Sequence, residues 1–269
     1  MILFFGCGRR DVDVDARTAG MGRLLRDALL FLLAAGLGAR FTSAGPLVHS
    51  SLRFKGSCVG VHDVKVDAFF EAMHDFLAFL RTLGPWTAGS ISETRNCLLK
   101  VERARRQLLE RGSTSDSGLK TIGGLLEVEL ACGIHRSNGM LADPSAAMGL
   151  LWIRRGLEFW VRLFRNELER LRERGSIDAE PGDLAKQTAR AYDQTVAPFH
   201  GWVSRKAFLL SMRSAPEWDV LRVRGKLPDA SCKDLQHEFD IWATTLDSVC
   251  NRLRKLHLRL DLEDRRKSI

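Results

Sequence analysis

The sequence predicts an all-α protein, and three observations predict it. Apolar residues recur every three to four positions along most of the chain, the spacing that gives a helix one buried face. Alternating apolar and polar runs, which a half-buried strand would need, are almost missing. Proline, which breaks helices, occurs only seven times in 269 residues, and tyrosine, which favours strands, occurs once.

Composition and charge narrow the class of partner. Hydrophobic residues make up 45% of the chain, enough for one large domain or two small ones. Lysine and arginine number 41 against 33 acidic residues, a net charge of +8 that suits an anionic surface such as nucleic acid or a membrane. No basic stripe is interleaved with stacking aromatic residues, and no recognition-helix motif occurs, so we do not expect nucleic acid as a partner.

The cysteines predict neither a metal site nor a disulfide framework. They are Cys7, Cys58, Cys97, Cys132, Cys232 and Cys250. No two of them form a CxxC pair or a zinc-ligand spacing, and most stand within helical patterns. We therefore expect small buried side chains in a reducing, cytoplasmic compartment, with no bound metal and no cofactor.

Residues 1–63 are expected to form an N-terminal extension to a domain over residues 64–269. Residues 21–44 begin with basic residues, continue with the apolar run Ala28–Ala39 and end in small residues. This order is typical of a signal or transit sequence for secretion or organellar import. The apolar run is shorter than the about 20 residues that span a bilayer. An extra helix that packs on the domain is the interpretation we favour. The Gly- and Ser-rich stretch Thr42–Asp63 is expected to be a loop or linker.

Periodic segments then predict a series of helices. They cover residues 64–83, 86–111, 119–133, 148–165 and 184–199, and a last helix follows the capping box Ser231-x-x-Asp234. Gly84 and Pro85 end the first of them, and the polar residues 112–118 separate the second from the third.

The helix over 148–165 is the centre of the prediction. Asp143 and Pro144 precede it, a capping acceptor followed by a residue that lacks an N–H group. Its first half is apolar around most of its circumference and should run through the interior. Arg154 and Arg155 nevertheless follow Trp152 there, and Gly156 suggests a close approach of backbone or ligand. The segment is either a packed core with snorkelling arginines or the floor of a polar site.

Two further features have a structural and a functional interpretation. Glu93, Cys97 and Lys100 share one face of the helix over 86–111, either as a solvated edge or as a pair at the mouth of a cleft. His200, between Phe199 and Gly201, follows a proline where helix propensity is poor, so something packs closely there. A lone histidine of this kind is more often a core residue than a functional one.

Three pieces of the sequence resemble one known family in content, order and spacing. They are LLEVE (Leu125–Glu129), LLWIRRGLEF (Leu150–Phe159) and YDQTVAPFHGW (Tyr192–Trp202). They look like the glycolipid transfer protein family, and the similarity extends from about Val64 to Leu260.

The resemblance implies a two-layer helical sandwich of about eight helices around a dry tunnel for one sphingolipid. It implies a headgroup site with Trp152 under the sugar and His200 bonding the ceramide amide, and Arg155, three residues on from Trp152, borders this site on the same helix surface. It further implies a monomer that contacts membranes transiently and needs no cofactor. Such proteins catalyse no covalent change, and no nucleophile–base pair or phosphate loop in the sequence indicates an enzyme.

The family also places an acid, an amide and a lysine on the helix after Pro85, at intervals of four and three residues. An ungapped alignment gives Ser92, Asn96 and Leu99, whereas a shift by one gives Glu93, Cys97 and Lys100. The ungapped alignment turns charged residues inward, and burying unpaired charges costs several kcal/mol. We therefore choose Glu93 and Lys100 for the headgroup site, with Asn96 able to supply the amide.

The headgroup itself stays open. In this family the glycolipid type has the tryptophan, which favours a glycosphingolipid on Trp152, whereas the type that carries ceramide 1-phosphate gathers arginines, as Arg154 and Arg155 would allow. A helical lipid-sensing or interaction module without transfer activity is a third interpretation, because the headgroup helix departs from the family pattern.

Overall fold

The computed structural model describes residues 45–112, 116–135, 140–178, 180, 182–212, 214–227, 231–264 and 266. All of them belong to one compact unit, Ala44–Ile269. The predicted signal-like segment or extra helix over residues 21–44 lies outside the described residues.

Within the described residues nearly every regular element is a helix. The α-helices are α2 (Pro46–Ser57), α3 (Val66–Thr82), α4 (Ala88–Glu110), α5 (Ile122–Ala131), α6 (Ala146–Arg174), α7 (Asp183–Thr195), α8 (Trp202–Met212), α9 (Trp218–Gly225) and α10 (Cys232–Arg259). Short 3₁₀ helices are η1 (Pro85–Thr87), η2 (Asp116–Leu119) and η3 (Ala197–Phe199), and the two-residue strands β1 (Cys58–Val59) and β2 (Asp63–Val64) pair antiparallel. The all-α prediction is confirmed.

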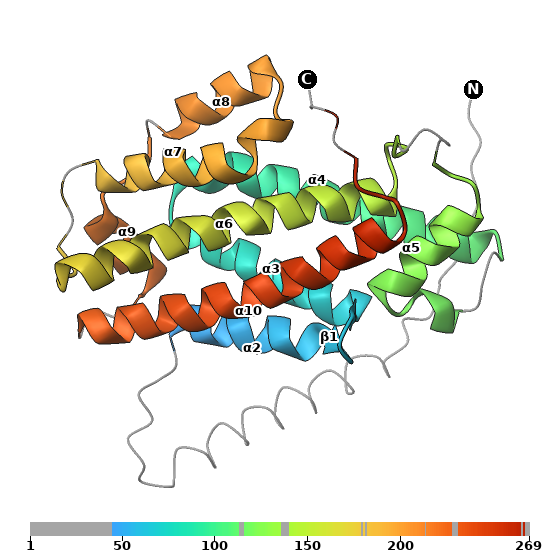
Figure 1. Cartoon of the computed structure of the whole chain (residues 1–269), viewed down its shortest axis with the longest axis horizontal. Coiled ribbons are helices and arrows are strands. Elements are labelled where there is room, and N and C mark those ends of the chain that lie inside the picture. Colours follow the sequence, from blue (N-terminus) through green and yellow to red (C-terminus); the bar gives the residue numbers. More distant parts are fainter. Residues whose placement is uncertain are drawn as a thin grey trace, which may run out of the picture. The chain divides into compact units, whose positions relative to one another are not determined.

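The helices form two layers. In Figure 1, α6, α7 and α10 lie in front of α3 and α4. The central helix α6 packs against α4, α7 and α10. Gly149 lets the layers approach closely, because a Cβ atom there would lie 2.7 Å from the carbonyl oxygen of Cys97 in α4. The sandwich that the resemblance implied is therefore confirmed.

The start of α6 is held by residues other than the predicted cap. Ser145, not Asp143, caps the helix, because its hydroxyl accepts a hydrogen bond from the backbone N–H of Met148 at 3.0 Å. The buried carboxylate of Glu129 accepts two more backbone N–H groups of the first turn, at 2.7 and 2.8 Å. Both satisfy donors that a helix start leaves unpaired, and the negative charge suits the helix dipole.

The helix α2 corrects the loop that we predicted over Thr42–Asp63. Leu47 and Phe54 on this helix are completely buried, and α2 packs against α3 and α10. The helical pattern is weak in the sequence because serines occupy much of the buried face; the Ser51 hydroxyl, for example, donates to the carbonyl of Leu47 at 2.8 Å. The predicted domain boundary between residues 63 and 64 stays a prediction.

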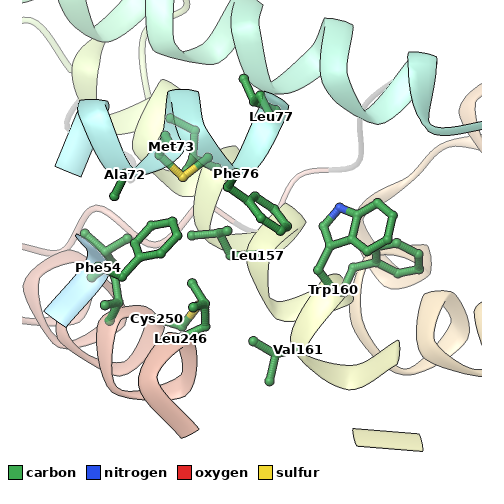
Figure 2. Packing of buried hydrophobic residues seen from close by; sticks show 14 of the residues in the cluster. Phe54, Ala72, Met73, Phe76, Leu77, Leu157, Trp160, Val161, Leu246 and Cys250 are labelled. Carbon is green, nitrogen blue, oxygen red and sulfur yellow. The ribbon is translucent and has the colours of Figure 1, made fainter. Parts of the chain in front are cut away.

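An aromatic cluster joins the two layers and supports the site described next. Figure 2 shows Phe76 of α3 pointing toward the indole of Trp160 in α6, and their ring centroids lie 6.2 Å apart in an edge-to-face arrangement. Phe76 also meets Phe54 of α2 at 6.4 Å and Trp242 of α10 at 5.3 Å. Such aromatic pairs add to the free energy of burial, so α6 has a well-fixed position.

No helix in the described part of the chain combines the length and apolar character that crossing a bilayer requires.

Candidate functional site

A cavity of about 550 Å³ opens between α4, α6 and α8. Its walls are largely aromatic and apolar, and its polar lining includes Glu93, Lys100, Asp143 and His200. Trp86, Trp152, Phe159, Trp160 and Phe208 form the aromatic part of the wall. A concave, mostly apolar cavity with a few convergent polar groups is typical of a site for a small organic ligand.

The helix α4 presents Glu93, Cys97 and Lys100 to this cavity. Ser92 and Leu99 are exposed, Leu99 to 44%, and neither lines the cavity. The geometry therefore agrees with the shifted register that places Glu93 and Lys100 at the site. Thr94 lines the cavity too.

Asn96, the predicted substitute amide, is exposed and is not among the residues that line the cavity. The next residue, Cys97, faces the cavity instead. Its thiol lies 3.7 Å from a carboxylate oxygen of Glu93. Burial, reinforced by the charge of Glu93, raises the pKa of Cys97 to about 12. The thiol is therefore protonated at neutral pH and can donate a weak hydrogen bond to Glu93.

A second carboxylate, which the sequence did not identify as a site residue, completes the charged rim. Asp143 lines the cavity, and its carboxylate lies 2.7 Å from the ammonium nitrogen of Lys100. We had interpreted Asp143 as a helix cap, but Ser145 has that role. The charged residues that line the cavity are thus Glu93, Asp143 and Lys100, with a net charge of minus one.

Trp152 and His200 form the aromatic floor of the polar end. The indole is half-buried on α6, and its ring centroid lies 5.7 Å from that of the imidazole, with 29° between the planes. Gly156, one turn further along α6, lines the same cavity, and a Cβ atom there would meet nothing within 4 Å. The glycine thus leaves room for a ligand rather than for a neighbouring backbone.

The Tyr192 hydroxyl is a hydrogen-bond partner of one ring nitrogen of His200. Its Nδ1 lies 2.9 Å from the hydroxyl of Tyr192, which also accepts a hydrogen bond from Arg205. In the tautomer in which the Tyr192 hydroxyl donates to Nδ1, the Nε2–H group is a donor toward a ligand. Burial, helped by the charges of Arg155 and Arg205, lowers the pKa of His200, so the ring is neutral at pH 7.

Arg155 lies beside the site rather than in it. Its guanidinium is 5.0 Å from the ring centroid of Trp152 and 3.6 Å from that of Phe199, but the residue does not line the cavity. Only 1% of Arg155 is exposed, and burial lowers its pKa to about 10, so it still carries its charge at neutral pH. The sequence suggested either a packed core with snorkelling arginines or the floor of a polar site. Neither interpretation was complete, because the arginines are buried and the polar site lies next to them.

A model of the family described as Glycolipid transfer protein (GLTP) matches residues 64–223, more than half of the chain. The chain belongs to the glycolipid transfer protein family. The match includes the cavity residues on α4, α6 and α8, together with Trp152 and His200.

The match with related sequences covers only part of this chain and only part of each relative. The Glycolipid transfer protein of Danio rerio is 28% identical over 121 residues, 43% of this chain and 56% of the relative. The Pleckstrin homology domain-containing family A member 8 of Rattus norvegicus is 36% identical over 158 residues, 58% of this chain and 26% of the relative. The chain therefore spans about half the length of the first relative and about a quarter of the second.

Solved structures share the GLTP fold. The apo form of mouse Ceramide-1-phosphate transfer protein has a TM-score of 0.66 at 18% identity, covering 81% of this chain and 98% of the mouse chain. A structure of FAPP2, described as selecting simple glycosphingolipids with the GLTP fold, has a TM-score of 0.64 at 17% identity, covering 85% and 98%. Family and fold are thus those of lipid transfer proteins, whereas the headgroup must be argued from this chain's own site.

In the described residues, no group of histidine, cysteine and acidic side chains is placed to hold a metal ion.

Proposed function

We propose that this GLTP-family protein transfers a sphingolipid between membranes and prefers a glycosylceramide. The observation that carries the proposal is the stack of Trp152 and His200 at the polar end of an apolar cavity. A flat aromatic face suits the apolar face of a sugar ring, and the cavity beyond it suits hydrocarbon. The role of each site residue follows from its place around this stack.

The charged rim favours a sugar over a phosphate. Sugar hydroxyls can donate to the carboxylates of Glu93 and Asp143 and accept from Lys100, whereas a phosphate mainly accepts at neutral pH. The charged residues that line the cavity carry one more negative charge than positive, and this charge opposes a phosphate at the rim. Ceramide 1-phosphate remains the alternative cargo, as the family and the structural likeness to the mouse Ceramide-1-phosphate transfer protein allow.

The ceramide part has matching partners. The Nε2–H group of His200 is available to donate to the amide carbonyl of a ceramide, and the aromatic wall with Phe159, Trp160 and Phe208 receives the start of a hydrocarbon chain. Each methylene removed from water contributes about 0.8 kcal/mol. Burial of the lipid's hydrocarbon chain therefore supplies affinity, and the polar rim determines which headgroup is preferred.

The helix α8 offers a surface for the membrane. Its residues Trp202, Val203, Leu209 and Leu210 are 70%, 55%, 44% and 65% exposed. The ammonium of Lys206 lies 4.3 Å from the ring centroid of Trp202, and an interfacial helix commonly combines basic and aromatic residues in this way. Other residues of α8 line the cavity, so the same helix can rest on a bilayer while a lipid passes beneath it.

A vesicle assay with the full chain tests the proposal. The expected result is transfer of a fluorescent glucosylceramide from donor to acceptor vesicles. Gly156→Leu should fill the open space beside Trp152 and reduce the transfer rate, while the helical circular dichroism spectrum is unchanged. Gly56→Leu is the matched control, because Gly56 is an exposed helical glycine of α2 at which a Cβ atom would also meet nothing within 4 Å.

Each alternative has its own outcome. Transfer of ceramide 1-phosphate in preference to glucosylceramide would refute the sugar preference and keep the carrier function. A folded protein that moves neither lipid would refute the carrier function and leave a lipid-sensing or interaction module. Equal rates for Gly156→Leu and Gly56→Leu would refute the cavity as the binding site.

A further inference from the structure

A short segment beyond α10 is held by hydrogen bonds to Leu141, in the loop that precedes α6. We call its described residues Leu262, Glu263, Asp264 and Arg266 the tail segment. Leu262 and Asp264 are 1% and 4% exposed. The Asp264 carboxylate accepts the backbone N–H of Leu141 at 3.1 Å, and the Arg266 guanidinium donates to the Leu141 carbonyl at 2.9 Å. The tail segment therefore has a fixed place beside the site.

The tail segment binds Arg154 and Arg155, two adjacent arginines of α6. The carboxylate of Glu263 accepts two hydrogen bonds from one guanidinium nitrogen of Arg154, at 2.6 and 2.9 Å. Arg155 donates to the backbone carbonyl of Asp264, and its nearest nitrogen lies 3.8 Å from Glu263. Arg154 and Arg155 are almost completely buried, so the tail segment helps to compensate their charge, together with Glu158, whose carboxylate lies 3.7 Å from Arg154.

The arginines are separated from the predicted headgroup position by the indole ring of Trp152. The Arg155 guanidinium is 5.0 Å from the ring centroid of Trp152 and does not itself line the cavity. Arg154 and Glu263 line a second cavity of about 590 Å³ beside α6. A positive charge at this place would attract an anionic headgroup at Trp152, and the charge of Glu263 opposes that attraction.

We propose that the tail segment determines headgroup choice: Glu263 and the Asp264 carbonyl hold Arg154 and Arg155 away from the cavity and neutralise part of their charge, which selects against a phosphate headgroup. This inference rests on the proposed function. It assigns a specificity role to residues that do not touch the ligand. Glu263 is thus a positioning residue, and its effect should appear in the choice between lipids rather than in transfer as such.

The experiment compares full-length variants in one vesicle assay with two cargoes, fluorescent ceramide 1-phosphate and fluorescent glucosylceramide. Glu263→Gln keeps the shape of the side chain and removes its charge. The ratio of the ceramide 1-phosphate rate to the glucosylceramide rate should rise on the order of tenfold, as expected for one unit charge near a partly buried site. Adding Arg154→Gln to this variant restores the charge balance and should lower the ratio again.

Glu127→Gln is the matched control. It also removes a carboxylate paired with an arginine, Arg259 at 2.7 Å, but it lies on α5 outside both cavities. Its ratio should equal that of the wild type. Asp264→Asn tests the anchor independently and should raise the ratio, because it weakens the bonds to Leu141 and Arg266.

The outcomes separate the two proposals. An unchanged ratio in a folded Glu263→Gln variant, with glucosylceramide still transferred by the wild type, overturns the role of the tail segment and keeps the carrier function. An equal rise in Glu127→Gln overturns it as well, because net charge alone would then explain the effect. A wild-type protein that moves neither lipid overturns the carrier function and the tail role together.

Discussion

The indole of Trp152 and the imidazole of His200 pack against each other, with their ring centroids 5.7 Å apart and 29° between their planes. Trp152 comes from α6, and His200 follows η3, so the two rings join the central helix to the segment that leads into α8. The two rings together form the aromatic surface at the polar end of the cavity. Each ring therefore supports the orientation of the other as well as contacting a ligand.

The first prediction concerns this surface. Trp152→Ala should reduce glucosylceramide transfer at least about tenfold, because the stacking face is lost and an aromatic contact contributes about 0.5–1.5 kcal/mol beyond its buried area. Trp152→Phe keeps a ring and should retain more transfer. The helical circular dichroism spectrum of both should survive, since Trp152 is only half-buried. If Trp152→Ala simply unfolds, the residue is part of the core and not a ligand platform.

The second prediction concerns the hydroxyl that orients His200. Tyr192→Phe removes the partner of Nδ1 but keeps the ring that stacks on Phe208 at 3.8 Å. Loss of one hydrogen bond of about 1 kcal/mol should slow transfer roughly fivefold. The melting temperature should change little in comparison, because the buried apolar area is retained. Transfer at the wild-type rate would show that the orientation of His200 does not depend on Tyr192.

The third prediction concerns acid pH. Burial, together with Arg155 and Arg205, lowers the pKa of His200 in the folded state, whereas the unfolded imidazole has a pKa of about 6.5. As the pH falls through 6.5, the unfolded chain takes up a proton that the folded chain does not. The contribution of His200 to the free energy of unfolding is therefore present above pH 6.5 and is lost toward acid.

Urea unfolding at pH 7.5 and pH 5.5 measures this effect. The wild type should lose more stability between these two values than His200→Gln, which has no imidazole to titrate. The comparison cancels groups that titrate in both proteins, such as His257, whose pKa is also lowered by burial. Equal losses in the two proteins would mean that His200 titrates normally.

Periodicity was sufficient for most of the fold and for α4 and α6, whereas α8 (Trp202–Met212), which also lines the cavity, was not among the predicted helices. The stripes of α3, α4, α6 and α10 are long, and long amphipathic patterns are the part of a sequence that is least ambiguous. The helix α2 escaped prediction because serines replace apolar residues on its buried face. Trp152 and His200 were assigned to the site from the resemblance, since no local rule distinguishes a ligand-binding ring from a core ring.

The rest of the site depends on contacts between distant positions. Asp143 follows the ordinary start pattern of a helix, and only the folded chain brings it to Lys100, 43 residues earlier. Glu263 meets Arg154 across 109 positions, and the same separation joins Arg155 to Asp264. A charged residue in a tail gives no sign of such a partner, because exposed charges near the end of a helix are common.

The last prediction tests the register of α4. The Lys100 ammonium faces the cavity and pairs with Asp143 at 2.7 Å, whereas Leu99 is 44% exposed and outside the cavity. A charge-assisted hydrogen bond to a headgroup is worth about 1.5–3 kcal/mol, so Lys100→Ala should slow transfer at least about tenfold. Its melting temperature should change little, because a partly exposed ion pair contributes about 1 kcal/mol or less.

Leu99→Ala is the neighbouring control and should leave both transfer and melting temperature near the wild-type values. In the alternative register the results exchange places, because Leu99 would face the headgroup and Lys100 would point its stem at the core. Both variants belong in one assay with glucosylceramide, each with its melting temperature. Full activity in Lys100→Ala would remove Glu93 and Lys100 from the site. The binding surface would then consist of Trp152 and His200, with Asp143 left as an unpaired carboxylate at the rim.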